Sequence, residues 1–549
     1  MKIKLKRNLC LLLLGFLSFA VLGQAYETAF DALLKEQQDS SGPGKVVLVA
    51  KDGEVIYKKA FGKANLELDV EMDTEHVFRL GSITKQFTAA AILKLAEEGK
   101  LSLKDDITKF IKDYPVHGHA ITLEHLLAHT SGIRNYTNLP QFTAEVRKKD
   151  YNPEELINFF KDEPMDFSPG EKHAYSNSGY ILLGRVIEIV SGKMYGEYID
   201  AAFFQPLGMK NSFYDYSSKL IPKRIPGYQK KGNTYENSDY LSMTLPYAAG
   251  SLVSTVEDLF IWNEAVMGDF VLSTKSREKA HAAQVLNNGK IIDYGLGWRL
   301  GNVQGSPSIK HGGLVNGFTS NALYLPDGKI FVAVLSNCDC TRSLDVLASK
   351  MAAIVLGKPY QWKEIELSNK QLESYKGVYE SEYEGQKMIS LQDGDLMYFN
   401  RGGSKSKIHP LGKDQFRLGN SLTVLQFKRN SDKNRASFEL KGLGLPVKYD
   451  RTSSGTIPTL KAIQIPSDAL ERYTGEYRFP SKFIFVVVIE GNKLYGQVGR
   501  DKKEIVPYKE NKFFAKEIDA RIIFSLDKDG KIIGLTKIQN DKMYAEKIK

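Results

Sequence analysis

A serine followed one helical turn later by a lysine lies in the stretch GSITKQF, residues 81–87. Apolar residues then recur with helical spacing until Gly99, which predicts a largely buried helix that begins at Ser82. Residues three apart on a helix are neighbours, roughly 5–6 Å between Cβ atoms, so the Lys85 amine can reach the Ser82 hydroxyl. A serine hydroxyl needs such a nearby base to act as a nucleophile. The stretch indicates nucleophilic catalysis, although Ser-x-x-Lys alone also recurs by chance.

The N-terminus has the pattern of an export signal. Basic residues within positions 2–7 precede an apolar run over residues 9–22, and Gly-Gln-Ala at 23–25 places small residues where a cleavage site needs them. The apolar run is short for a membrane span, and no later stretch is long and apolar enough to replace it. We expect a signal peptide over residues 1–25 and an exported mature chain, periplasmic or extracellular, without a membrane span.

Two cysteines remain after this leader, Cys338 and Cys340, separated by one residue. They are too few for a disulfide-based scaffold, although an exported compartment would permit one. Side chains two apart on a strand face the same side, and pairing them would close a strained ring. We therefore expect free, partly buried thiols.

The formal net charge of +10 could indicate a nucleic-acid partner. The basic surplus falls in the leader and after residue 360, which leaves residues 26–360 mildly acidic. After residue 360 the basic residues are spread singly along predicted strands rather than clustered with aromatic residues. We therefore expect a solvated basic surface and no nucleic-acid partner.

Residues 26–360 show strands first, helices in the middle, and strands with a helix last. Segments rich in Val, Ile and Tyr predict strands, and long apolar periodicity predicts helices. This order favours an α+β fold, an antiparallel sheet flanked by helices with a helical subdomain. The predicted elements are a hairpin at 45–60, a buried helix from about 179 to 190, strands at about 307–313, 317–325 and 330–336, and a helix at about 342–356.

An internal repeat follows residue 360. The stretch LESYKGVY at 372–379 matches LERYTGEY at 470–477, an offset of 98, and Pro410 matches Pro507 with a slip of one. A polar segment at 453–458 links the copies. Short alternating strands in units of this size favour small closed barrels, so we predict two all-β domains, over residues 361–452 and 465–549.

Two further motifs accompany Ser82 and Lys85. Tyr175 and Asn177 are two apart on a predicted extended loop, where side chains face the same way. The stretch HGG at 311–313 lies on a predicted strand, where missing side chains let a substrate backbone approach closely. In this order the motifs resemble the serine β-lactamase and penicillin-binding-protein superfamily, most closely its class C β-lactamase, D-aminopeptidase and esterase subgroup.

The resemblance covers about residues 30–357 and assigns residues 26–360 to a serine hydrolase domain. It also implies that the two predicted barrels are lipocalin-like domains, which in such proteins limit substrate size, stabilise the fold or bind a partner. Further matching stretches are LLAHTSG at 126–132, FSPGE at 167–171, PLGM at 206–209, AGS at 249–251 and YGLGW at 294–298.

The resemblance implies acyl transfer. Ser82 would attack a carbonyl and form an acyl-enzyme that water then hydrolyses. Lys85 and Tyr175 would share the general acid and base roles, and Asn177 would hold Lys85 and the substrate amide. Which of Lys85 and Tyr175 accepts the serine proton stays open. The oxyanion would bind the backbone N–H groups of Ser82 and of Leu314, the residue after Gly313, each contributing on the order of 3–4 kcal/mol.

His311 is a departure from the pattern. The β-lactamases and carboxypeptidases that the chain resembles carry a lysine there, a permanent cation beside a substrate carboxylate. A histidine is only partly charged at neutral pH, so the attraction for a carboxylate is weaker. We expect weak or no β-lactamase activity and a preference for amides or esters that lack a carboxylate at that position.

The predicted function is that of an exported serine hydrolase without cofactor or metal, acting on small peptides or D-amino-acid amides. A carboxylesterase is the alternative with the same chemistry, and a non-catalytic penicillin-sensing or binding protein is the alternative from another class. Two histidine pairs, at 117 and 119 and at 125 and 129, could suggest zinc. Neither has the H-E-x-x-H pattern, so no metal site is predicted.

Overall fold

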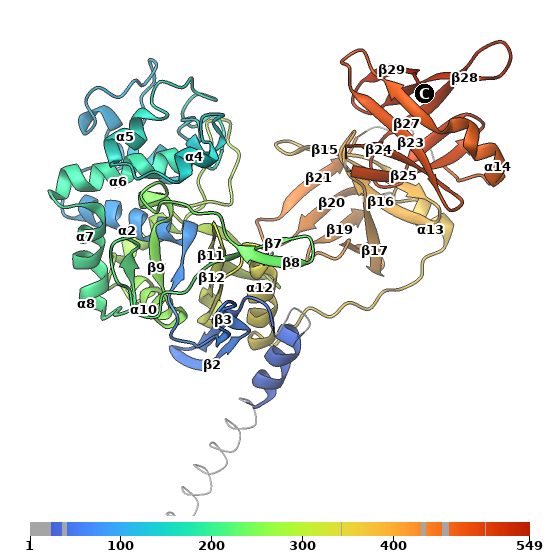
Figure 1. The fold of residues 1–549 in the computed structure, drawn as a ribbon. Coiled ribbons are helices and arrows are strands. Elements are labelled where there is room, and N and C mark those ends of the chain that lie inside the picture. The colour runs from blue at the N-terminus through green and yellow to red at the C-terminus, as the bar shows by residue number, and fades with distance from the viewer. Residues whose placement is uncertain (1–23, 36–40, 342, 430–434, 453–459, 500) are drawn as a thin grey trace, which may run out of the picture. The chain divides into compact units, whose positions relative to one another are not determined.

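The computed structural model describes residues 24–35, 41–341, 343–429, 435–452, 460–499 and 501–549 (Figure 1). One compact unit contains the described residues up to Tyr360 together with Leu443–Leu445, and a second contains the remainder of the C-terminal part. The predicted leader lies outside the described residues up to position 23, and residues 24–35 are helical. In the described ranges no helix combines the length and apolar character needed to cross a bilayer.

A six-stranded antiparallel sheet forms the centre of the first unit. Its strand order is β10-β11-β12-β13-β1-β2, so the hairpin from the start of the unit pairs with the last strand, Val47 lying opposite Val334. The predicted hairpin and the three predicted late strands are confirmed. The strands are β1 (Lys45–Lys51), β2 (Glu54–Phe61), β10 (Arg299–Val303), β11 (Ser306–Val315), β12 (Phe318–Leu325) and β13 (Ile330–Ser336).

Both faces of this sheet are covered by helices. Strand β13 reads IFVAVLS and is buried throughout, because its successive side chains point to opposite faces and each face carries an apolar core. Phe331 and Leu335 join the core that contains α2 (Thr84–Glu97). Val332 packs on the other face with α12 (Leu344–Val355). The predicted α+β class is confirmed.

Helices and short sheets fill the region between β2 and β10. Helix α6 covers the predicted buried helix and ends at Ser191, where Gly192 with φ 70° caps it in the left-handed conformation. The helices are α3 (Leu123–Leu127), α4 (Ala144–Arg147), α5 (Pro153–Asn158), α6 (Asn177–Ser191), α7 (Tyr195–Ile199), α8 (Gln205–Leu207), α9 (Tyr247–Gly250), α10 (Val256–Met267) and α11 (Thr274–Ala280). The short strands are β3 (Lys63–Asn65), β4 (Val70–Glu71), β5 (Phe78–Arg79), β6 (Phe213–Tyr214), β7 (Tyr228–Lys231), β8 (Thr234–Asn237) and β9 (Leu252–Ser254).

The second unit contains two closed eight-stranded antiparallel barrels, as the repeat predicts. The repeat is visible in the cores, since Tyr379 donates its hydroxyl hydrogen to Tyr375 O (2.9 Å) and Tyr477 does the same to Tyr473 O (2.8 Å). The first barrel comprises β14 (Gly377–Ser381), β15 (Gly385–Gln392), β16 (Asp395–Phe399), β17 (Ser406–Gly412), β18 (Gln415–Leu418), β19 (Val424–Arg429), β20 (Arg435–Lys441) and β21 (Val447–Arg451). The second comprises β22 (Gly475–Arg478), β23 (Ile484–Glu490), β24 (Lys493–Val498), β25 (Asp501–Lys509), β26 (Lys512–Ala515), β27 (Arg521–Leu526), β28 (Ile532–Ile538) and β29 (Lys542–Lys547).

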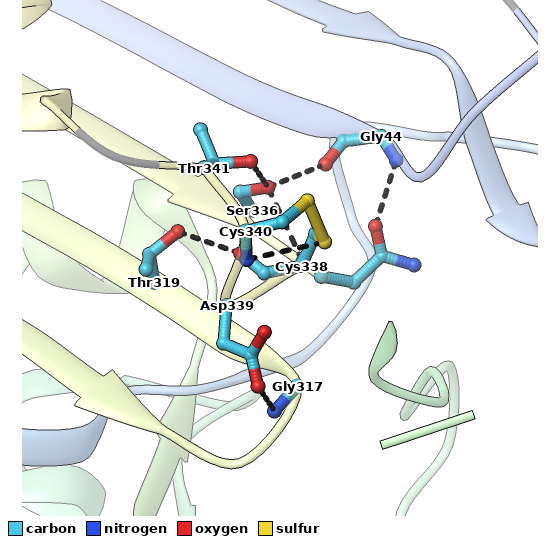
Figure 2. Close-up of a disulfide and its surroundings, with 9 residues drawn as sticks. Gly44, Gly317, Thr319, Ser336, Cys338, Asp339, Cys340 and Thr341 are labelled. Carbon is cyan, nitrogen blue, oxygen red and sulfur yellow. Dashed lines mark hydrogen bonds between the residues drawn. A yellow bond between two sulfur atoms is a disulfide. The ribbon is translucent and has the colours of Figure 1, made fainter. Parts of the chain in front are cut away.

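The prediction of free thiols is wrong, because Cys338 and Cys340 form a disulfide (Figure 2). Strand β13 ends at Ser336, so the cysteines lie in a turn rather than on a strand, and their Cα atoms are 5.1 Å apart. The turn is held against the start of β12, where Thr319 Oγ1 donates to Cys338 O (2.9 Å). A turn, unlike a strand, lets side chains two apart converge.

Candidate active site

Ser82 lies in a single 3-10 turn, η1 (Gly81–Ile83), between β5 and α2. The predicted helix therefore begins at Thr84, two residues later than expected. Gly81 has φ 53, and a Cβ atom there would lie 2.9 Å from Leu314 N on β11. Only glycine permits both the left-handed backbone and this close approach. The turn thereby brings the backbone of Ser82 beside that of Leu314.

The residue before this turn is fixed from two sides. Leu80 N donates to Leu252 O on β9 (2.9 Å), and Leu80 O accepts the hydroxyl hydrogen of Ser320 on β12 (2.7 Å). A Cβ atom on Gly313 would lie 1.9 Å from Leu80 O, so β11 also needs a glycine at this point. The nucleophile turn is consequently anchored both to the large sheet and to the small sheet that contains β9.

The Lys85 amine contacts three oxygen atoms. Its Nζ lies 3.2 Å from Ser82 Oγ, 2.8 Å from Asn177 Oδ1 and 2.8 Å from Ala249 O. Lys85 is fully buried, and burial lowers its pKa well below the ordinary value, assisted by the charge of Arg299. The amide and backbone oxygens only accept hydrogen bonds, so a neutral amine gives them its two N–H groups. The lone pair then faces the Ser82 hydroxyl, as a general base requires.

The Tyr175 ring lies beside this amine, with its centre 4.8 Å from Lys85 Nζ. Its hydroxyl is buried and has no hydrogen-bond partner in the described part of the chain. Burial raises the pKa of Tyr175 and outweighs the opposing influence of the nearby Ser82 hydroxyl and of Arg299. Tyr175 is therefore a neutral phenol at neutral pH, a proton donor rather than a phenolate base.

His311 belongs to a directed chain of hydrogen bonds. Ser176 N donates to His129 Nδ1 (3.2 Å), so the proton of that ring is on Nε2, which lies 3.2 Å from the Tyr294 hydroxyl. The Tyr294 hydroxyl lies 2.9 Å from His311 Nε2, and His311 Nδ1 lies 2.7 Å from Gly312 O, a pure acceptor. His311 consequently carries its proton on Nδ1 and accepts from Tyr294. Each bond in the chain has one donor and one acceptor when both rings are neutral.

The pKa shifts of His311 and His129 agree with two uncharged imidazole rings. Burial is the main cause that lowers the pKa of His311, to about 3. Burial also holds the pKa of His129 well below its usual range. His311 is thus uncharged at neutral pH, rather than partly charged as expected from its type, and it provides no cation at this position.

Arg299 is a residue that the sequence reasoning missed. Its guanidinium carbon lies 5.5 Å from the centre of the Tyr175 ring and 5.4 Å from that of Tyr294. It is half-buried on β10 and is a permanent cation facing the reactive groups. The signal that could have identified it is its place directly after the matching stretch YGLGW.

A cavity of about 250 Å³ opens beside Ser82. Leu314 contributes to its wall and has 65% of its side chain exposed. The structure thus places all the predicted site residues in one region: Ser82, Lys85, Tyr175, Asn177, His311, Gly313 and Leu314. The cavity is lined by Gly81, Ser82, Tyr136, Thr137, Phe142, Arg147, Asn177, Leu241, Leu245, Pro246, Ala249, Gly250, Leu314, Val315 and Asn316.

The histidines of the second pair have structural partners. His125 Nδ1 accepts from Thr122 N (3.3 Å) in the capping box of α3, and both ring nitrogens of His129 belong to the chain described above. Within the described ranges no group of three or more His, Cys, Asp or Glu side chains is placed to hold a metal ion. The described residues bring a hydroxyl, an amine, a phenol and an amide group to this site.

Comparisons with known proteins agree with this arrangement. The family model described as Beta-lactamase matches residues 30–355, and one described as Domain of unknown function (DUF3471) matches residues 459–547. Penicillin-binding protein 4* of Bacillus subtilis (strain 168) is 31% identical over 388 residues, which are 67% of this chain and 83% of that protein.

Two solved structures are similar over most of their own length. The octameric penicillin-binding protein homologue from Pyrococcus abyssi superposes with a TM-score of 0.54 and 26% identity, covering 87% of this chain and 99% of that one. A D-stereospecific amidohydrolase from Streptomyces sp. superposes with a TM-score of 0.52 and 26% identity, covering 59% of this chain and 96% of that one. The similarity to the Pyrococcus abyssi protein covers 87% of this chain and so extends beyond the residues that form the large sheet and its helices.

Proposed function

The chain belongs to the β-lactamase family of serine hydrolases, and from this premise we propose that it hydrolyses amides of small peptides or D-amino acids through an acyl-enzyme on Ser82. The observation that carries the proposal is the contact of the buried Lys85 amine with Ser82 Oγ (3.2 Å), Asn177 and Ala249. The similarity to a D-stereospecific amidohydrolase supports an amide of a D-amino acid as the substrate. The cavity of about 250 Å³ suits a small acyl group.

In the proposed mechanism the Ser82 oxygen attacks the amide carbon while the neutral Lys85 amine takes the serine proton. The carbonyl electron pair moves to oxygen, and the oxyanion is stabilised by the N–H groups of Ser82 and Leu314. When the C–N bond breaks, the leaving amine takes the proton of the Tyr175 hydroxyl, and the Lys85 ammonium replaces that proton. Water then attacks the acyl-enzyme, loses its proton through the same groups, and releases the acid and free Ser82.

The neutral His311 favours substrates without a carboxylate at that position, because a ring held at a pKa of about 3 offers no cation there. Arg299 leaves a cation on another side of the site. We therefore propose weak activity on penicillins compared with amides. A carboxylesterase remains the second candidate, because ester carbonyls undergo the same acyl transfer more easily than amides.

Covalent labelling tests the nucleophile. A fluorophosphonate probe should label the wild-type protein and a Ser102→Ala control, whose serine is on the surface. It should not label Ser82→Ala. Absence of labelling in a folded wild-type protein would instead favour a non-catalytic penicillin-binding role, which the similarity to penicillin-binding protein 4* makes the natural rival.

A substrate panel tests the specificity. D- and L-aminoacyl amides, the matching esters and a chromogenic cephalosporin should rank with D-amides first and the cephalosporin last. Esters cleaved with no measurable amide turnover would favour the carboxylesterase, and efficient cephalosporin hydrolysis would contradict the proposed consequence of His311.

We also propose that the chain is exported by the predicted leader. The disulfide between Cys338 and Cys340 supports an oxidising compartment, where such bonds persist. Expression in a bacterial host followed by fractionation and N-terminal sequencing should find the chain outside the cytoplasm, starting near residue 26. A cytoplasmic chain that retains the apolar run over residues 9–22 would contradict this proposal.

A further inference from the structure

The two barrels differ in charge at one equivalent pair of positions. Gln392 ends β15 as Glu490 ends β23, an offset of 98 that the strand pairing supports. Lys405, just before β17, corresponds to Lys502 in β25, because Ile408 and Ile505 hold equivalent places in their ladders at an offset of 97. In the second barrel the pair is therefore Lys and Glu, and in the first it is Lys and Gln.

At this position the first lysine therefore lacks the carboxylate that the second lysine has, although the more distant carboxylate of Asp519 acts on it. Lys502 forms an ion pair with Glu490. Lys405 Nζ instead donates to the neutral Gln392 Oε1 (3.1 Å) and to Ala515 O (3.1 Å). Among the residues that the structure describes, no carboxylate lies within ion-pairing distance of the Lys405 amine.

The surroundings of Lys405 disfavour the charged form of its amine. Its Nζ lies 5.7 Å from the ring centre of Phe399 and 5.5 Å from that of Phe514. Burial lowers the pKa of Lys405 to about 8, because a charged amine is poorly solvated there, and the opposing charge of the Asp519 carboxylate does not restore the ordinary value. A bound anion would stabilise the charged form.

A cavity of about 360 Å³ lies beside this lysine, between the two barrels of the second unit. Its charged lining residues are Arg401, Lys405, Arg521 and Asp519, three cations and one carboxylate. Its apolar lining consists of Val378, Met388, Leu391, Leu460 and Ile538, and its neutral polar lining of Ser390, Gln392, Gln539 and Asn540.

Backbone hydrogen bonds join the barrels at this cavity. Lys405 N donates to Glu517 O (2.6 Å), Asp519 N donates to Gly403 O (2.8 Å), and Gly402 N donates to Asp519 Oδ2 (3.0 Å). The last bond holds the carboxylate of Asp519 to the backbone. The walls are therefore built from both barrels and tied together, as a preformed binding site requires.

We propose that this cavity binds a small organic acid with an apolar body. The carboxylate of the ligand takes the place that Glu490 occupies in the second barrel and pairs with Lys405, with Arg401 and Arg521 adding to the attraction. The apolar body packs against the aliphatic lining. The volume is near the lower end of the range for small-molecule sites, roughly 300–1,000 Å³, so the ligand is a short-chain or single-ring acid.

Isothermal titration of the full chain with sodium octanoate tests the proposal. The wild-type protein should bind octanoate saturably at this site. Gln392→Glu supplies the missing carboxylate from within the chain and should weaken binding by about tenfold or more. Lys405→Gln should weaken it similarly by removing the cation. Lys502→Gln, which alters the corresponding lysine of the other barrel, should leave binding unchanged.

The variants also separate this cavity from other places where octanoate could bind, including the cavity beside Ser82. Equal affinity of the wild-type protein and Gln392→Glu would overturn the proposal, and so would the absence of saturable binding to the wild-type protein at millimolar concentrations. Gln392→Glu should unfold at the same or a higher temperature than the wild type, because it restores an ion pair. Gln392→Glu therefore tests the proposed site even where Lys405→Gln folds poorly.

Discussion

Lys85 is a fully buried amine and Lys405 a half-buried one, and they lie in different units of the chain. Among the described residues, neither forms an ion pair with a carboxylate. Each donates to a side-chain amide oxygen and to a backbone carbonyl, Asn177 and Ala249 for Lys85, and Gln392 and Ala515 for Lys405. Burial lowers the pKa of both. The third contact distinguishes them, because Lys85 faces a serine hydroxyl whereas Lys405 faces a cavity lined by further cations.

The comparison teaches that a lowered pKa does not define a catalytic base. Lys85 can act as a base because the Ser82 hydroxyl lies 3.2 Å from its amine. The contacts of Lys405 with the described residues include no nucleophile, and its proposed role is to bind an anion. Substitution of Lys85 should therefore affect turnover, and substitution of Lys405 should affect the binding of an anion.

The largest expected effect is on turnover. Lys85→Gln should lower kcat on an amide substrate by about 10³-fold, since it removes the general base. Lys405→Gln should leave kcat within experimental error of the wild type. Steady-state kinetics of the two variants, with circular dichroism to verify folding, make the measurement. A comparable loss of kcat in both variants would contradict the proposed difference between the two lysines.

The next effect concerns the phenol. Tyr175→Phe removes a hydroxyl that has no hydrogen-bond partner in the described part of the chain, so the melting temperature should change little. The value of kcat should fall by about 10²-fold, because the leaving amine loses its proton donor. Full activity in Tyr175→Phe would show that Lys85 performs both proton transfers.

A smaller effect is a displacement of the pH profile. Since Lys85 must be neutral to accept the serine proton, kcat/KM should rise as pH increases through the pKa of Lys85. The positive charge of Arg299 lowers that pKa, so Arg299→Met should raise it and move the rising limb to higher pH. The profile of Gln392→Glu should coincide with that of the wild type. An unmoved limb in Arg299→Met would contradict the proposed coupling.

The smallest effect is on stability at alkaline pH. Lys405 has a folded pKa of about 8, below the ordinary lysine value of 10.5, so the unfolded chain binds more protons between these values. This group therefore makes the folded state more stable as pH rises from about 8 to about 10.5. In Gln392→Glu the new carboxylate should raise the folded pKa and remove that increment. Chemical unfolding of both proteins across this range measures it, and parallel curves would contradict the assignment.

Local patterns predicted much of the fold. Segments rich in Val, Ile and Tyr predicted the β1–β2 hairpin, and the 98-residue offset predicted two barrels. Both depend on neighbours in sequence or on repetition, which a single chain displays. The disulfide was missed because the prediction placed Cys338 and Cys340 on a strand that in fact ends at Ser336.

The amino-acid sequence by itself determined the motif residues, from Ser82 and Lys85 to Tyr175, Asn177 and the HGG stretch, and their order along the chain. Only the tertiary structure decided which groups surround each ionisable side chain, and therefore which of these side chains are charged at neutral pH. It buried His311 against Tyr294, set Arg299 over Tyr175, and left Lys405 beside an amide where its counterpart has a carboxylate. A pKa depends on excluded water and on groups within a few ångströms, and those groups come from segments far apart in sequence.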